Sequence, residues 1–168
     1  MVSSPKKVSV VEATQEDISE IAKLSIEMLK YHNKLMSNYF TIYPHEKYVE
    51  NFQQKLKEGQ YILVAKIDDK IVGFLSAKFK KTPWYKYANA CMIDEISVSE
   101  KYRSCGIGTA LIKKTLSLCK KKKIEEIKLD IYNANVDAKR LYEHLGFKDL
   151  RQQMFLVLTR NSRLNTDR

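Results

Sequence analysis

Hydrophobic and polar residues in the first half of the chain follow two rhythms, one typical of strands and one typical of helices. Two segments repeat apolar residues every three or four positions, which predicts two helices that each present one apolar face. Short runs of β-branched and apolar residues before and after them predict strands. The predicted elements are a strand at residues 8–11, helices at 14–31 and 44–59, and strands at 61–67 and 71–79, the last two joined by a hairpin turn at Asp68-Asp69-Lys70.

The second half of the chain alternates strands with helices. β-branched residues favour a strand at 92–98, and helical spacing returns from Gly106 onward. The later predicted elements are a strand at 127–131, a short helix from Asn135 to Gly146, and closing strands at 148–150 and 154–158. The predicted order is therefore βααβββαβαββ, a mixed α/β domain in which helices flank a sheet.

A glycine loop lies between the strand at 92–98 and the helix that follows it. Neither Gly106 nor Gly108 carries a side chain that would block a ligand, and Arg103 adds a positive charge. The first amides of a helix lack partners within the helix and lie at its positive end, so they suit a phosphate or pyrophosphate. The alternative is a tight turn that allows close helix packing. The loop is neither a dinucleotide fingerprint nor a Walker loop, because the further glycine and the Gly-Lys-Ser/Thr are missing.

The short helix further along the chain has both ends marked. Asn135 suits the N-cap, Asp137 the first turn and Gly146 the left-handed stop. Together, Arg-x-x-Gly-x-Gly at 103–108 and Asn-x-x-Ala-x-x-x-Tyr-x-x-x-Gly-Phe at 135–147 resemble the two signature segments of the GNAT superfamily of N-acetyltransferases. The joint match of the two segments is far more specific than either segment alone.

The resemblance implies a GNAT-like acyl-CoA N-acyltransferase fold with a central mixed, mostly antiparallel sheet. It implies acetyl-CoA as cosubstrate and direct attack by a primary amine in a ternary complex. The backbone of residues 96–98 would pair with the pantetheine arm like an added strand, and one of its amides would polarise the thioester. The resemblance implies that the cofactor-binding residues are Ile96, Ser97, Val98, Arg103, Ser104, Cys105, Gly106, Ile107, Gly108, Thr109 and Asn135. Asn135 also suits a helix cap, and Cys105 also suits a residue that only fills the loop.

Acetyl transfer to an amine needs a proton acceptor, an oxyanion donor and a group that stabilises the leaving thiolate. Tyr142 resembles the family tyrosine that acts as general acid near the cofactor sulfur; packing on the apolar helix face is the alternative. Asp94 and Glu95 are adjacent on a strand, so we expect them to point to opposite faces. Either is a candidate base, acting through water, or a solvated or salt-bridged strand residue. Asp94 matches the base of polyamine-type members, whereas the base of protein-acetylating branches would fall at Ala90.

Length and composition add limits to this interpretation. The 168 residues fit one domain, at residues 1–160, with a polar tail at 161–168. The three cysteines form no C-x-x-C pair and no apolar signal segment is present, so we expect reduced thiols in the cytoplasm. The three histidines have no ligand spacing, so no metal site is expected. No apolar run approaches the ~20 residues that a membrane helix needs.

The net charge of +10 fits a polyanionic cofactor or a nucleic acid. Much of it lies in Lys113, Lys114 and residues 120–123, which also fit a solvated helix face, and little aromatic interleaving accompanies them. The charge argues against a highly cationic acceptor. We favour a small-molecule amine (polyamine, amino acid or aminoglycoside-like) over a protein amine. A nucleic-acid-binding module and a CoA-sensing regulator are the non-enzyme alternatives, and a homodimer is compatible with the closing strands.

Overall fold

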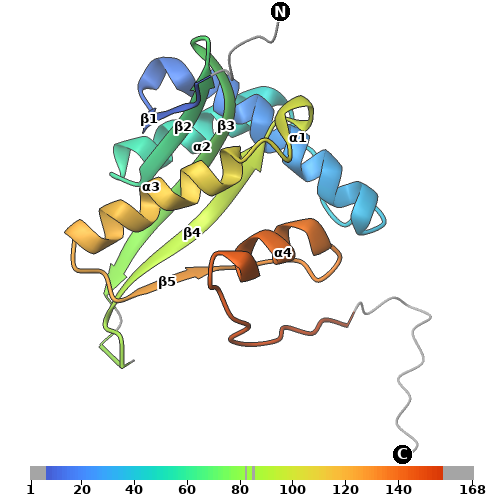
Figure 1. The fold of residues 1–168 in the computed structure, drawn as a ribbon. Coiled ribbons are helices and arrows are strands. Elements are labelled where there is room, and N and C mark those ends of the chain that lie inside the picture. Colours follow the sequence, from blue (N-terminus) through green and yellow to red (C-terminus); the bar gives the residue numbers. More distant parts are fainter. Residues whose placement is uncertain (1–6, 82, 85, 157–168) are drawn as a thin grey trace, which may run out of the picture.

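The fold is built on a five-stranded mixed sheet in the computed structural model, which describes residues 7–81, 83–84 and 86–156 (Figure 1). The strands lie in the sheet in their order along the chain. They are β1 (Ser9–Glu12), β2 (Tyr61–Ile67), β3 (Lys70–Lys81), β4 (Asn89–Val98) and β5 (Glu126–Leu129). Neighbours run antiparallel except β4 and β5, which run parallel. The predicted mixed, mostly antiparallel sheet is confirmed.

Among the described residues, two α-helices cover each face of this sheet (Figure 1). One face carries α1 and α2, and the other carries α3 and α4. Short 3-10 helices precede α1 and follow β4. The helices are η1 (Gln15–Asp17), α1 (Ile18–Leu35), α2 (His45–Lys57), η2 (Glu100–Tyr102), α3 (Ile107–Lys121) and α4 (Val136–His144).

Each face of the sheet has its own hydrophobic core. Ile21 of α1, Phe52 of α2 and Phe74 of β3 are fully buried on one face. Leu75 of β3 and Leu111 of α3 are fully buried on the other face, in the cluster against which α4 packs. Alternate residues of the central strands thus face different helices, and a polar residue on β4 belongs to one layer or the other.

The closing strands predicted at 148–150 and 154–158 are wrong within the described residues. Residues 148–156 form neither helix nor strand, and they run past the end of α4 (Figure 1). Two runs of so few residues do not specify sheet pairing, because β propensity depends on the neighbours that a strand packs against. Residues 157–158 of the second predicted strand, and the predicted tail at 161–168, lie outside the described residues.

Ion pairs connect the segment after α4 to the rest of the molecule. Lys139 Nζ of α4 lies 2.8 Å from Asp149 Oδ2, and Arg151 Nη2 lies 3.8 Å from Asp130 Oδ1, just after β5. Four large apolar side chains of this segment stay exposed: Leu150, Met154, Phe155 and Leu156. The segment therefore brings an arginine next to β5 without adding to the sheet.

Gly73 lies where β3, β4 and the start of α3 meet. A Cβ at this position would lie 2.9 Å from the carbonyl oxygen of Ser97 and 3.2 Å from Cγ2 of Ile107. Real Cβ atoms essentially never come so close to a backbone oxygen. Glycine at this point therefore lets α3 begin close to the end of β4, and this sets the position of the glycine loop.

Replacing Gly73 with alanine should lower the free energy of unfolding by about 1–3 kcal/mol, because the added methyl group overpacks a backbone contact. Gly108→Ala is the matched control. Its Cβ would meet only Cδ2 of Leu141, at 3.2 Å, and a flexible side chain can move. Alanine also favours the helix by about 1 kcal/mol over glycine. Urea denaturation of both variants measures the difference, and equal losses would contradict this account.

Candidate active site

β4 and β5, the last two strands of the described sheet, diverge from each other, and this fork is the main feature of the site (Figure 1). Their parallel pairing runs from Ala90 opposite Glu126 to Ile93 opposite Leu129, and it stops there. Beyond Ile93, β4 pairs with β3 alone. The other edge of residues 94–98 therefore presents backbone groups that no described strand pairs. Ile96, Ser97 and Val98, which the resemblance assigns to cofactor binding, lie on this edge.

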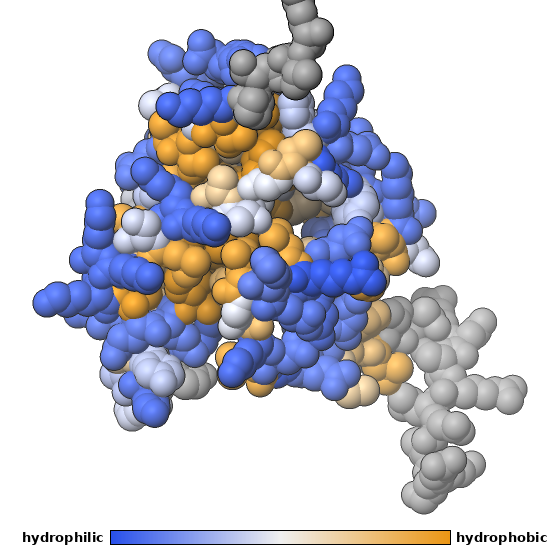
Figure 2. Space-filling view, in the orientation of Figure 1, coloured by the Kyte–Doolittle hydropathy of each residue, from blue (hydrophilic) through white to orange (hydrophobic). Residues whose placement is uncertain are grey.

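The glycine loop, residues 103–108, leads from η2 into α3. Gly106 has a φ of 77°, so the left-handed turn relies on a residue without a side chain. The first helical hydrogen bond runs from the amide of Ala110 to the oxygen of Gly106 at 2.9 Å, and no side chain caps the helix. The amides of residues 107–109 therefore have no acceptor within α3. Figure 2 shows the surface hollowed between this end of α3 and α4.

Arg103 connects the glycine loop to α1 and β4. Its guanidinium carbon lies 4.3 Å from the ring centre of Tyr31, and its Nε donates to the carbonyl oxygen of Val98 at 3.3 Å. These contacts keep a positive charge beside the exposed residues Ser104 and Cys105. The sequence indicated the charge, but not the aromatic ring that positions it.

Asn135 caps α4, as its position in the sequence predicts. Its Oδ1 accepts a hydrogen bond from the amide of Ala138 at 3.3 Å. With the oxygen turned to the helix, Nδ2 lies 3.4 Å from Nε2 of His32, on α1. An amide nitrogen can only donate, so Nε2 is the acceptor and the imidazole carries its proton on Nδ1.

His32 is a residue of this site that sequence reasoning missed. Its ring centre lies 6.1 Å from that of Tyr31, 6.0 Å from Phe40 and 5.4 Å from Tyr132. Burial, and secondly the nearby charge of Arg103, lower the pKa of His32 below 6.5, so the ring is neutral at pH 7. No spacing in the sequence signals this cluster, because α1, the loop after it and the segment after β5 contribute one aromatic residue each.

Tyr142 is 8% exposed and packs in the hydrophobic core on the α3 face. Its ring centre lies 5.8 Å from that of Phe147. Burial raises the pKa of the Tyr142 hydroxyl to about 12, so the phenol is protonated throughout the neutral range. The residue combines the packing that its helix face predicts with a hydroxyl that can only donate or accept hydrogen bonds there.

The expectation that Asp94 and Glu95 point to opposite faces is wrong. Ser76 of β3 pairs with Glu95, whereas Ala77 pairs with Ile93, so Asp94 is the extra residue of a β-bulge. The bulge interrupts the alternation of side chains. Both carboxylates consequently lie on the face of the sheet that α1 and α2 cover.

The two carboxylates have different surroundings on that face. Glu95 lies beneath the helices, where Ser25 Oγ of α1 donates to it at 2.8 Å and Lys55 of α2 forms an ion pair with it. Asp94 lies further along the strand, and its Oδ1 is 2.7 Å from Nζ of Lys78 on β3. Each carboxylate thus forms a salt bridge, which was one of the alternatives that the sequence allowed. Asp94, and not Glu95, lines the pocket described next.

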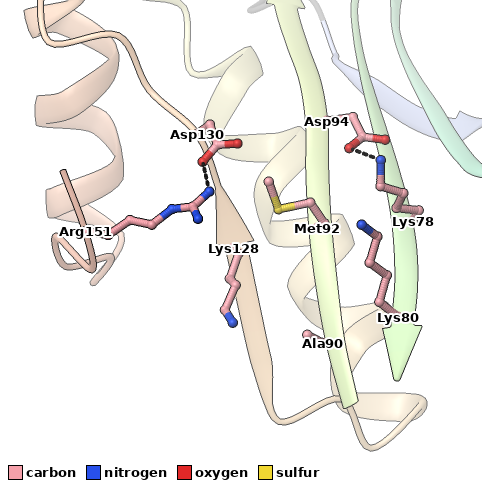
Figure 3. A pocket seen from close by; sticks show the side chains of 8 residues that line it. All are labelled: Lys78, Lys80, Ala90, Met92, Asp94, Lys128, Asp130 and Arg151. Atoms are coloured by element: carbon pink, nitrogen blue, oxygen red, sulfur yellow. Dashed lines mark ion pairs between the residues drawn. The ribbon is translucent and has the colours of Figure 1, made fainter. Parts of the chain in front are cut away.

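This pocket, of about 360 Å³, lies on the face of the sheet opposite α3 (Figure 3). Ala90 and Met92 of β4 form its centre, and charged side chains from both neighbouring strands surround them. The lining residues are Lys78, Lys80, Ala90, Met92, Asp94, Lys128, Asp130 and Arg151. The pocket and Tyr142 therefore lie on opposite faces of the sheet. Sequence reasoning missed the pocket lysines because they come from separate strands.

The three cysteines form no disulfide: Cys91 and Cys119 are buried and Cys105 is exposed. Burial raises the pKa of Cys91 to about 12, so its thiol stays protonated. Among residues 7–81, 83–84 and 86–156, no three His, Cys, Asp or Glu side chains are grouped to hold a metal ion. Within the same part of the chain, no helix has the length and apolar character needed to span a membrane.

Comparison with known proteins identifies the family. The model of the acetyltransferase (GNAT) family matches residues 28–147, which include the fork, the glycine loop and α4. This chain belongs to the GNAT family of acetyltransferases. The match includes both segments that carry the resemblance in the sequence.

Two curated relatives differ in how much of their length this chain covers. N-acetyltransferase 8B of Homo sapiens is 31% identical over 64% of this chain and 47% of its own length. An N-alpha-acetyltransferase of Sulfurisphaera tokodaii is 30% identical over 65% of this chain and 67% of its own length. The chain thus spans about half of the human relative.

Solved structures share the fold over most of the chain. The tetramutant of the BH1408 protein from Bacillus halodurans has a TM-score of 0.80 at 28% identity, covering 89% of this chain and 99% of its own. The aminoglycoside N-acetyltransferase AAC(6')-Iy, solved in complex with CoA, has a TM-score of 0.72 at 15% identity. It covers 94% of this chain and 99% of its own. At 15% identity, the comparison with the aminoglycoside N-acetyltransferase shows a shared fold alone.

The lowered pKa of His32 predicts how stability depends on pH. The pKa of His32 is lower in the folded protein than in the unfolded chain, so the unfolded chain takes up a proton first as the pH falls. The neutral ring therefore contributes fully to the free energy of unfolding above about pH 6.5. This contribution is lost as the pH falls through the lowered pKa. We expect the free energy of unfolding, measured in urea, to fall less between about pH 7.5 and 5.5 in His32→Asn than in the wild type. The difference in slope should stay below about 1.4 kcal/mol per pH unit.

The exposed residue His144, replaced in the same way, is the matched control for His32→Asn. If both variants flatten the pH profile equally, the effect does not come from the half-buried imidazole of His32.

Proposed function

We propose that this chain is an N-acetyltransferase that transfers the acetyl group of acetyl-CoA to a primary amine in a ternary complex. The fork carries the proposal: an unpaired β4 edge and a glycine loop lie on one side of it, and a charged pocket lies on the other. Membership of the acetyltransferase family supports it. The CoA complex of the aminoglycoside N-acetyltransferase with this fold supports the choice of cosubstrate.

The α3 side of the fork fits a long polar molecule that ends in a diphosphate. Nothing lies within 4 Å of the position that a Cβ of Gly106 would take, so backbone and ligand can approach closely. The free amides of residues 107–109 and the charge of Arg103 would hold phosphate oxygens. The unpaired edge of residues 96–98 would pair with the amides of the pantetheine arm. Bound there, acetyl-CoA supplies the thioester from which the acetyl group is transferred.

Tyr142 would assist departure of the thiolate. Its hydroxyl is protonated at neutral pH, because burial raises its pKa to about 12, and so it can donate a hydrogen bond to sulfur. An ordinary thiol has a pKa of about 8.5. Complete proton transfer from this phenol to a thiolate is therefore unfavourable. Tyr142 would act mainly by hydrogen bonding to the developing negative charge.

Asp94 is the better of the two candidate bases. It borders the pocket and has one cationic partner, Lys78, whereas Glu95 already accepts from Ser25 and Lys55 beneath the helices. A primary ammonium group with a pKa near 10 must lose a proton before it can attack. Asp94 would take this proton, directly or through a water molecule.

We favour a small-molecule amine as the acceptor. A pocket of about 360 Å³ falls within the range of roughly 300–1,000 Å³ typical of small-molecule sites. Ala90, where the base of protein-acetylating branches would fall, lines this pocket. A protein amine remains the second hypothesis, and the archaeal relative named N-alpha-acetyltransferase is the observation that favours it.

Removing the Tyr142 hydroxyl tests the proposed mechanism. We expect Tyr142→Phe to lower kcat by about 10²-fold, because the thiolate loses its donor. Stabilisation by acetyl-CoA should be retained. Turnover is measured as release of free thiol with a panel of amines, and binding as a shift in Tm. An unchanged kcat removes Tyr142 from this role. A wild-type protein that neither gains stability with acetyl-CoA nor releases thiol with any amine contradicts the proposed function.

Replacing the two carboxylates separates base from structural residue. Asp94→Asn should lower kcat by 10²-fold or more, most strongly at low pH, and change the free energy of unfolding little. Glu95→Gln should lower the free energy of unfolding by about 1–3 kcal/mol, because Lys55 would lose a partly buried charged partner. Kinetics and urea denaturation of both variants measure these effects. Loss of turnover in Glu95→Gln but not in Asp94→Asn would make Glu95 the base.

A further inference from the structure

We infer that the amine accepted by this protein also carries a carboxylate group, which the lysines of the pocket beside Asp94 bind. The inference rests on the proposed acetyltransferase function and adds the class of substrate. Four Lys and Arg side chains and two Asp side chains line the pocket, which gives the lining a net charge of +2 at neutral pH.

Ion pairs compensate all but one of the cations that line the pocket. Asp94 pairs with Lys78 at 2.7 Å, and Asp130 pairs with Arg151 at 3.8 Å (Figure 3). Both pocket carboxylates therefore already have a cation. Lys128 pairs with Glu126, at 2.8 Å, which lies outside the lining. The remaining cation, Lys80, has no ion pair within the part of the chain that the structure describes.

The geometry leaves room for an anion between two cations. Lys80 extends from β3 and Lys128 from β5, on either side of Ala90 and Met92 of β4 (Figure 3). Ala90 is small, so the part of the pocket next to it is not filled by its own side chain. A carboxylate bound above Ala90 would have lysines on both sides. The amine of the same molecule would then lie toward Asp94, at the end of the pocket nearest the fork.

The charge of the pocket also disfavours purely cationic acceptors. A second ammonium group would come close to several like charges, and each such contact at the protein surface costs affinity about tenfold. A carboxylate gains by a similar factor. Polyamines should therefore be poor acceptors, although Asp94 matches the base of polyamine-type members of the family.

Two sources can supply a carboxylate-bearing amine, and paired acceptors distinguish them. A free amino acid is represented by glycine against glycinamide and by glutamate against glutamine. A peptide is represented by two peptide amides that begin with Asp or with Asn. Putrescine is the cationic comparison. We expect kcat/KM for thiol release to be about tenfold or more higher for the carboxylate member of at least one pair.

A charge reversal at Lys80 tests the role of the pocket. Lys80→Glu should reduce the preference for the carboxylate acceptor by about tenfold or more, mainly through KM. Lys81→Glu is the matched control: Lys81 is the next residue of β3, is also exposed, and lies outside this pocket. It makes the same change in net charge and should leave the preference unchanged.

The outcomes separate this inference from the function on which it rests. If the wild type uses uncharged or cationic amines as well as their carboxylate partners, the inference is overturned and the acetyltransferase stands. Equal effects of Lys80→Glu and Lys81→Glu overturn it too, as does a protein stabilised by acetyl-CoA that uses none of the carboxylate amines. Absence of both stabilisation by acetyl-CoA and turnover with any amine instead refutes the proposed function.

Discussion

The parallel pairing of β4 with β5 extends over only a few residue pairs, and the rest of the site depends on where it stops. Ile93 opposite Leu129 is the last pair. The next residue of β4, Asp94, is the extra residue of a bulge, and a bulge bends a strand and increases its twist. The two strands therefore diverge beyond this pair, and the following residues of β4 are paired on one side only. The Val98 carbonyl oxygen accepts from Arg103 Nε, and the other unpaired backbone groups need a partner, either water or a ligand with amides of its own.

The unpaired half of β4 is held in place by α1. Ser97 Oγ donates to the carbonyl oxygen of Leu24 at 3.1 Å, and Glu27 Oε1 accepts from the amide of Glu100 at 2.5 Å, just beyond the strand. Glu95 accepts from the same helix. These side chains point away from the fork edge. Hydrogen bonds to α1 thus hold this part of β4 in place without a strand beside it, and the strand edge stays available to a ligand. The polar residues of this strand therefore have a structural role in contacting α1, in addition to any role in catalysis.

The features that the sequence predicts well are those that neighbouring residues determine. Gly106 takes a left-handed turn and Asn135 caps a helix, because each conformation depends on a few adjacent residues. The errors come from distant contacts. Alternation along β4 fails at Asp94 because the register with β3 shifts there, and no strand forms at 148–156. His32 joins the site only because α1 passes over the segment between β5 and α4. A single sequence carries no signal for contacts between residues so far apart along the chain.

The distribution of charge around the fork links the two sides of the proposed site. A polyanionic cofactor would account for positive charge at the glycine loop, where Arg103 and the end of α3 lie. It would not neutralise Lys80, which has no ion pair among the described residues and lines a pocket on the opposite face of the sheet, together with the paired Lys78 and Lys128. Like charges held together around a pocket repel one another, and a bound anion relieves this repulsion. The positive charge at the loop and the positive charge at the pocket therefore have separate explanations, and only the one at the loop follows from the family.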